Sequence, residues 1–144
     1  MRGLSEEQIR LHPTISTLSI GGLVKHVTLV ERSWTDFITH GTSAMAGGDA
    51  ASFAEHATTF DLTDDETAAA LVARYKETAT ATEELITTLP SLDIAHPLPE
   101  APWFEEGASW SARRVLLHIV AETAQHAGHA DIIRETIDGA RSMG

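Results

Sequence analysis

Apolar residues recur at steps of three and four along the segment that follows Ser19. They are Leu23, Val27, Val30, Trp34 and Phe37. This spacing places all five on one face of a helix, which predicts that the face packs against a core. We predict a helix from Ser19 to about His40, because Gly41 and an alanine- and glycine-rich run follow it.

Capping signals predict two more helices in the first two thirds of the chain. Residues 63–66 read Thr-Asp-Asp-Glu, a capping box, which we expect to open a helix that continues to Leu89. Ser5 and Gln8 form a similar reciprocal pair, which predicts a short helix over residues 4–11.

The end of the chain predicts the last helix. Ser109 or Ser111 is expected to cap it, and it runs to about Asp138 with Gly139 in the usual stop position. Prolines in the preceding residues 90–107 exclude a continuous helix there, so we expect an ordered loop.

Two segments between the predicted helices are less regular. Trp103 and Phe104 lie in the proline-containing loop, and we expect these large aromatic side chains to anchor on the core rather than line a pocket. Residues 49–62 are ambiguous and predict no element.

The chain as a whole is predicted to be all-α. No segment keeps the alternating pattern of a strand for long, and 144 residues suit one domain spanning residues 1–144. A formal charge of -11 disfavours nucleic acid as a partner. The sequence has neither an apolar run of about 18 residues nor a signal-peptide pattern, so we expect no membrane partner and a cytoplasmic location.

Polar residues gather on one face of the last predicted helix. His118, Glu122, His126 and His129 are spaced by near whole turns and project into an arc of roughly 80°. Apolar residues share this arc, which predicts that the polar column points into the bundle. They are Val115, Ile119, Ile133 and Ile137. Burying carboxylate and imidazole groups costs free energy unless they are paired or bind a metal.

A metal site is one explanation of this column. Glu122 and His126 have the i, i+4 spacing of two ligands of one ion, and His26 is a candidate third ligand at the edge of the first helical stripe. The alternative is a buried hydrogen-bond network, and spacing alone does not choose between pairs such as His118 with Glu122 and His126 with His129. The remaining charged and imidazole side chains near these segments are expected to be solvated. They are His12, His40, His56, His96, Glu31 and Arg32.

Three segments of the chain resemble one family. Residues 22–27, 30–34 and 115–135 are similar to those of the DinB-like superfamily of metal-binding helical bundles, within its actinobacterial mycothiol S-transferase branch. The resemblance implies an up-down four-helix bundle, here with the first helix short or missing. It also implies a metal triad of His26, Glu122 and His126, supported by His118 and His129, that holds zinc or else nickel or manganese.

The resemblance also implies a function. We expect a metal-dependent S-transferase that takes mycothiol as co-substrate and uses the metal-bound thiolate as nucleophile against a small electrophile. The chain has no cysteine, so any thiol must come from a bound molecule. The alternatives are a mycothiol-dependent isomerase, a non-catalytic metal-binding or interaction bundle, and, last, a metal-dependent hydrolase with Glu31 or another carboxylate as base. We further expect a homodimer, because a partner copy would cover the groove left by a missing helix.

Overall fold

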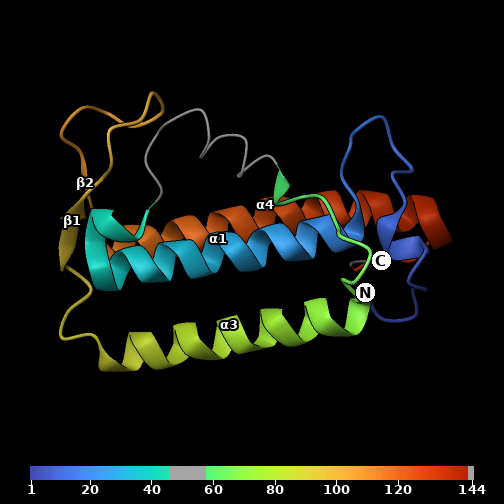
Figure 1. Cartoon of the computed structure of the whole chain (residues 1–144), viewed down its shortest axis with the longest axis horizontal. Coiled ribbons are helices and arrows are strands. Elements are labelled where there is room, and N and C mark those ends of the chain that lie inside the picture. The colour runs from blue at the N-terminus through green and yellow to red at the C-terminus, as the bar shows by residue number, and fades with distance from the viewer. Residues whose placement is uncertain (46–57, 143–144) are drawn as a thin grey trace.

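The computed structural model describes residues 1–45 and 58–142, and three long helices dominate this part of the chain (Figure 1). Helix α1 spans Ile20–His40, α3 spans Ala68–Thr88 and α4 spans Ala112–Asp138. The all-α prediction is confirmed in its main features, with a small two-stranded sheet as the addition. The ambiguous stretch of residues 49–62 lies largely outside the described residues.

Local capping sets both ends of α1 and α4, as predicted. The Ser19 hydroxyl accepts a hydrogen bond from the Gly22 amide, and Ser111 does the same for the amide of Arg114. These bonds satisfy amide groups that have no partner within the helix. Gly139 ends α4 in the left-handed conformation, with a φ of 76°, which costs glycine no steric strain.

The predicted start of α3 is wrong by several residues. The helix begins at Ala68, and its cap is Thr67, whose hydroxyl accepts a hydrogen bond from the Ala70 amide. Glu66 does accept a hydrogen bond from the Thr63 amide, as in a capping box, but these residues form a turn ahead of the helix. The later start of the helix reflects tertiary contacts, because the Glu66 carboxylate also pairs with Lys25 of α1 and Arg74 of α3.

The short N-terminal helix is smaller than predicted. Ser5 and Gln8 form the expected reciprocal hydrogen bonds, yet the helical part is one 3-10 turn, η1, over Gln8–Arg10. A second such turn, η2, spans Gly41–Ala44 after α1.

The proline-containing segment holds a hairpin that the sequence pattern did not predict. Strand β1, Ala95–Pro97, pairs antiparallel with β2, Ser109–Ser111, with His96 opposite Trp110. Three-residue strands are too short to show a period of two. Phe104 anchors on the core as predicted, but Trp103 is 54% exposed, so the prediction is wrong for Trp103.

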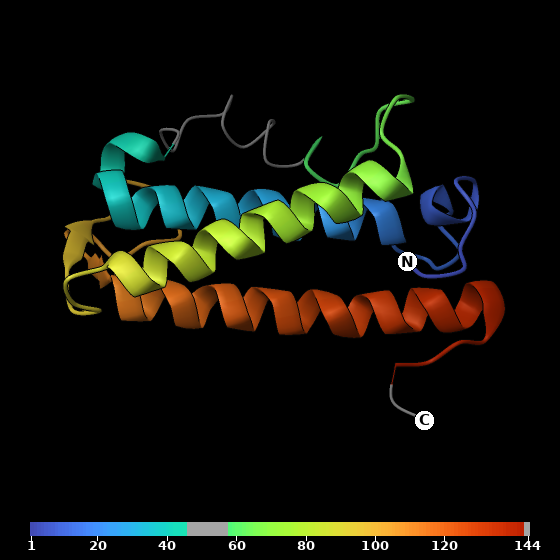
Figure 2. The same cartoon turned by 90° about the horizontal axis from the view of Figure 1, so that it is seen from below.

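Helix α1 is central and packs against both α3 and α4 (Figure 1). It runs parallel to α3 and antiparallel to α4, and Figure 2 shows that α3 crosses the other two obliquely. The described part of the chain therefore contains three long helices, and a four-helix bundle is not seen in it. Within the described residues, α1 and α3 run parallel to each other.

Two apolar clusters hold α1 to α4, one toward each end of the pair. The first joins Trp34 and Phe37 of α1 to Val115 and Ile119 of α4. The second, at the other end, joins Ile20 and Leu23 to Ile133. Burial of this apolar surface stabilises the pair and fixes which turns of the two helices face each other. His26 and His126 lie between the clusters.

Candidate metal centre

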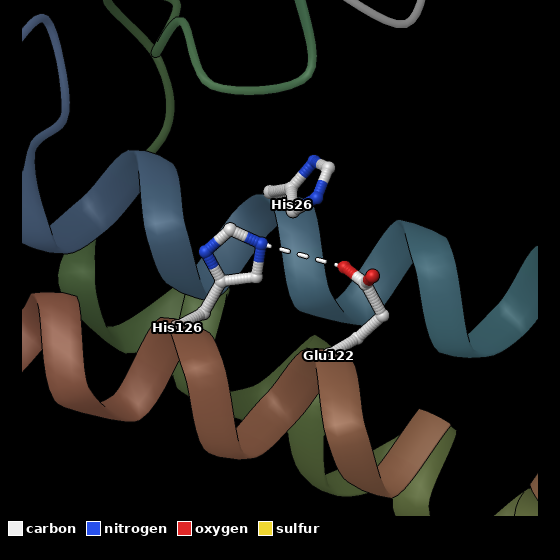
Figure 3. A group of neighbouring side chains, drawn as sticks. All are labelled: His26, Glu122 and His126. Atoms are coloured by element: carbon white, nitrogen blue, oxygen red, sulfur yellow. Dashed lines mark ion pairs between the residues drawn. The ribbon is translucent and has the colours of Figure 1, made fainter. Parts of the chain in front are cut away.

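His26, Glu122 and His126 come together at the α1–α4 contact (Figure 3). One ligand atom from each lies within 4.8 Å of the other two. Glu122 and His126 are one turn apart on α4, and the His126 Nε2 atom lies 3.5 Å from a Glu122 oxygen. The predicted grouping of these three residues is therefore what the structure contains.

The backbone around Gly22 determines what covers His26. A Cβ atom built at Gly22 would lie 2.1 Å from the Phe60 carbonyl oxygen. Only glycine at this position therefore lets the backbone of Phe60 approach α1 so closely. Phe60 stacks on the His26 ring with centroids 3.9 Å apart, and Thr59 Oγ1 shares a 2.8 Å hydrogen bond with His26 Nδ1. A hydrogen bond at one ring nitrogen fixes the orientation of a metal-binding histidine.

His126 is poised to act as a neutral ligand. Burial lowers the pKa of its imidazole, and this effect outweighs the nearby charge of Glu122, which acts in the opposite direction. Its ring lies edge-on to His26, with centroids 4.8 Å apart. A neutral imidazole has a lone pair for a metal, whereas an imidazolium ion has none.

His118 supports Glu122 from the preceding turn of α4. Its Nε2 atom is 4.0 Å from the other Glu122 oxygen, so the carboxylate lies between two imidazoles. The rings of Trp34 and Trp110 stack on each other and both meet the edge of His118, at centroid distances of 5.0 and 5.1 Å. Burial lowers the pKa of His118 as well.

His129 lies beside the group, with its ring centroid 5.5 Å from that of His126. Among the described residues, the Nδ1 atoms of these two histidines are the buried side-chain polar atoms that have no hydrogen-bond partner. Leaving such atoms unsatisfied costs about 1–3 kcal/mol each. A metal held by the His126 Nε2 atom, which faces Glu122, would leave both Nδ1 atoms unchanged, so the metal-site interpretation rests on the triad itself.

The residues present fit a divalent metal. Two imidazoles and one carboxylate are the donor set of catalytic zinc sites that keep a position for water or substrate. Ligand atoms of one tetrahedral ion lie roughly 3.4 Å apart, so the three side chains would close in slightly on an ion.

Other predicted polar residues do not join the site. His12 and His40 are exposed as expected, and His56 lies outside the described residues. His96 is half-buried instead of solvated, since its Nε2 atom lies 3.1 Å from the Ile38 carbonyl oxygen and its ring meets Phe37.

Glu31 is the clearest correction. It is buried rather than solvated, because Thr82 of α3 donates a 2.6 Å hydrogen bond to its carboxylate. This bond directs Glu31 toward α3 and argues against its assignment as the base of a hydrolase.

Sequence reasoning missed Thr59 and Phe60, the two residues that cover His26. They belong to a segment whose pattern predicts no element, so nothing local placed them at the site. The adjacent glycines Gly21 and Gly22 at the start of a helix are the one available signal, because glycine there indicates a close approach of other backbone.

Comparison with known proteins identifies the family of the chain. The model of the mycothiol S-transferase family matches residues 1–139. Neither curated proteins nor solved structures give a match to the chain. In the described part of the chain, no helix is both long and apolar enough to cross a membrane. Because the family model covers nearly the whole sequence, the chain belongs to the mycothiol S-transferase family.

Proposed function

We propose that the protein is a metal-dependent S-transferase that joins the sulfur of mycothiol to a small electrophile. The observation that carries the proposal is the meeting of His26, Glu122 and His126 in a chain that the family model matches over residues 1–139. Since the chain has no cysteine, the thiol must arrive as a co-substrate.

The chain's own residues would hold and orient the reacting groups. His26 and His126 would bind the ion as neutral imidazoles, and Glu122 would add a negative charge. His118 would hold the Glu122 carboxylate in place from one turn away, and His129 would support His126. A divalent metal held there would supply positive charge that stabilises a thiolate at neutral pH.

Zinc is the proposed ion, because two nitrogen donors and one oxygen donor suit it, although nickel or manganese would accept the same set. A location in the cytoplasm is part of the proposal, since a thiol co-substrate stays reduced in that compartment.

Elemental analysis of the purified, zinc-reconstituted protein tests the ligands. We expect about one ion per chain in the wild type and in His40→Ala, whose imidazole is exposed, and loss of the ion in His26→Ala, Glu122→Ala and His126→Ala. Circular dichroism checks that each variant stays helical. Equal metal content in all the proteins would overturn the triad.

Product analysis tests the reaction. Metal-loaded protein, mycothiol and an alkylating electrophile should give the thioether at a rate that falls at least about 100-fold in Glu122→Ala. The His40→Ala variant is the matched control and should retain the rate. An isomerised substrate with no thioether would favour the isomerase alternative, and one bound ion with no turnover of either kind would favour a non-catalytic bundle.

A further inference from the structure

A turn that begins at Thr58 contacts the first two turns of α1. The Asp61 amide donates a 3.0 Å hydrogen bond to the Thr58 carbonyl oxygen, so Thr59 and Phe60 occupy the two middle positions of the turn. The Lys25 ammonium group on α1 donates a 2.6 Å hydrogen bond to the Asp61 carbonyl oxygen. The turn is therefore tied to the helix through its own backbone.

Gly22 sets how closely this turn approaches α1. A Cβ atom at this position would collide with the Phe60 carbonyl group, and glycine leaves that space free. Neither this contact nor the Lys25 hydrogen bond involves an imidazole or an ion. We therefore expect the turn to hold its place on α1 before a metal binds.

The turn presents one hydroxyl group to the candidate metal centre. Thr59 Oγ1 lies 2.8 Å from His26 Nδ1, and the Phe60 ring lies against one face of the imidazole at an interplanar angle of 16°. His26 is only 3% exposed, so little room is left for its ring to turn. In Figure 3 the other nitrogen of this ring, Nε2, lies on the side of Glu122 and His126.

Metal binding would decide which group donates the hydrogen bond between Thr59 and His26. A neutral imidazole that gives its Nε2 lone pair to an ion carries its proton on Nδ1. His26 Nδ1–H would then donate to the Thr59 hydroxyl, and without that oxygen a buried donor would lose its partner. His126 differs, because its buried Nδ1 atom has no hydrogen-bond partner among the described residues. Of the two imidazoles, His26 is therefore the one that the fold holds in place.

From these contacts we propose that Thr59 is a positioning residue of the metal centre. Its hydroxyl accepts the hydrogen bond from His26 Nδ1–H and so directs the Nε2 lone pair at the ion, and the turn keeps the hydroxyl in place. Thr59 acts on the ion only through His26, so its role rests on the proposed triad. Metal affinity then depends on a residue outside both helices that carry the ligands.

Competitive titration of zinc against a chromophoric chelator tests the proposal. Thr59→Val keeps the size of the side chain and removes the acceptor, so we expect the zinc dissociation constant to rise about 10- to 100-fold. Thr59→Ser restores the hydroxyl and should bind zinc within about 3-fold of the wild type. Thr58→Val, the same substitution at the exposed neighbouring position, is the matched control and should bind as the wild type does.

The visible absorption of cobalt-loaded protein separates a positioning role from a purely structural one. The spectrum of the bound ion should change in Thr59→Val and return in Thr59→Ser, because the orientation of the His26 ligand changes and is restored. Circular dichroism checks that each variant is folded. Wild-type zinc affinity and an unchanged cobalt spectrum in Thr59→Val would overturn the role of Thr59 and leave the triad standing. A wild type that binds no zinc would overturn both.

A double-variant experiment tests whether the turn sets the position of Thr59. Gly22→Ala displaces the turn, so it should weaken zinc binding through the same hydrogen bond that Thr59→Val removes. We expect the variant with both changes to bind zinc about as weakly as the weaker single variant. Two losses that multiply would mean that the changes act independently, and would overturn the coupling between the turn and the ligand.

Discussion

Glu66 carries the most perturbed carboxyl group among the described residues. Burial would raise its pKa, but hydrogen bonds from Arg74 at 2.6 Å, Lys25 at 2.9 Å and the Thr63 amide at 3.1 Å outweigh that effect and lower the pKa from 4.5 to about 2. Lys25 comes from α1 and Arg74 from α3, so one carboxylate ties the turn before α3 to both helices. Glu66 therefore links the turn over residues 63–66 to the packing of α1 against α3.

Acid should weaken the fold through this carboxylate. Because the pKa of Glu66 is lower in the folded state, its contribution is present above pH 4.5 and is lost as the pH falls toward 2; it amounts to about 3 kcal/mol. Urea unfolding should show Glu66→Gln less stable by about that amount at pH 7, with the difference from wild type shrinking between pH 4.5 and 3. Glu77→Gln on the exposed side of α3 is the control, and a difference that does not depend on pH would contradict the assignment.

The same residue shows where local rules stop. The capping box correctly predicts the hydrogen bond between Glu66 and the Thr63 amide, but the further bonds to Lys25 and Arg74 hold Glu66 ahead of the helix. The family resemblance assigned His26, Glu122 and His126 together. Spacing placed Glu122 and His126 on one helical face, because such positions follow from sequence separation alone. It failed for Glu31, whose direction depends on Thr82 from a distant part of the chain.

At the scale of elements, the first turn of α1 connects helix packing to the candidate metal centre. Gly21 has no side chain and so leaves room for Ile9 and Leu62, and Gly22 leaves room for the Phe60 backbone. This close approach lays Thr59 and Phe60 over His26. The start of the helix therefore helps to orient an imidazole that lies one turn further along.

Gly22→Ala should disturb this arrangement. The added Cβ would lie 2.1 Å from a backbone oxygen, which has little room to move, so we expect the free energy of unfolding to fall by about 1–3 kcal/mol despite the better helix propensity of alanine. Zinc affinity should fall as well, because the cover over His26 shifts. Chemical unfolding and competitive metal titration measure the two effects. An alanine variant with unchanged stability would show that the segment does not need this close approach.

At the scale of the molecule, the polar triad interrupts the apolar contact between α1 and α4. One cluster lies around Phe37 and Val115, the other around Leu23 and Ile133, and the candidate metal centre lies between them. An ion bound there would join the two helices where apolar packing does not. Metal binding should then stabilise the whole fold, because the unfolded chain cannot present all three ligands together.

Removing the ion should lower the melting temperature. A ligand present at about 100 times its dissociation constant stabilises the folded state by about 2.7 kcal/mol, which corresponds to a shift of roughly 10 °C for a domain of this size. Calorimetry of zinc-loaded protein before and after treatment with a chelator measures the shift. Glu122→Ala should melt at one temperature in both conditions, and a wild type that does the same would argue against an ion that joins the helices.

The sequence by itself determined the ends of α1 and α4 and placed Glu122 and His126 one turn apart on one helical face, because caps and helical faces depend on residues a few positions apart. The family resemblance assigned His26 to the triad, and the packing of α1 on α4 brings it there. Only the tertiary structure decided the cover of Thr59 and Phe60 over His26, the start of α3 at Ala68 and the parallel course of α1 and α3. It also decided the direction of Glu31. Each of these depends on contacts between residues far apart in the chain, and packing and burial settle such contacts where no local pattern records them.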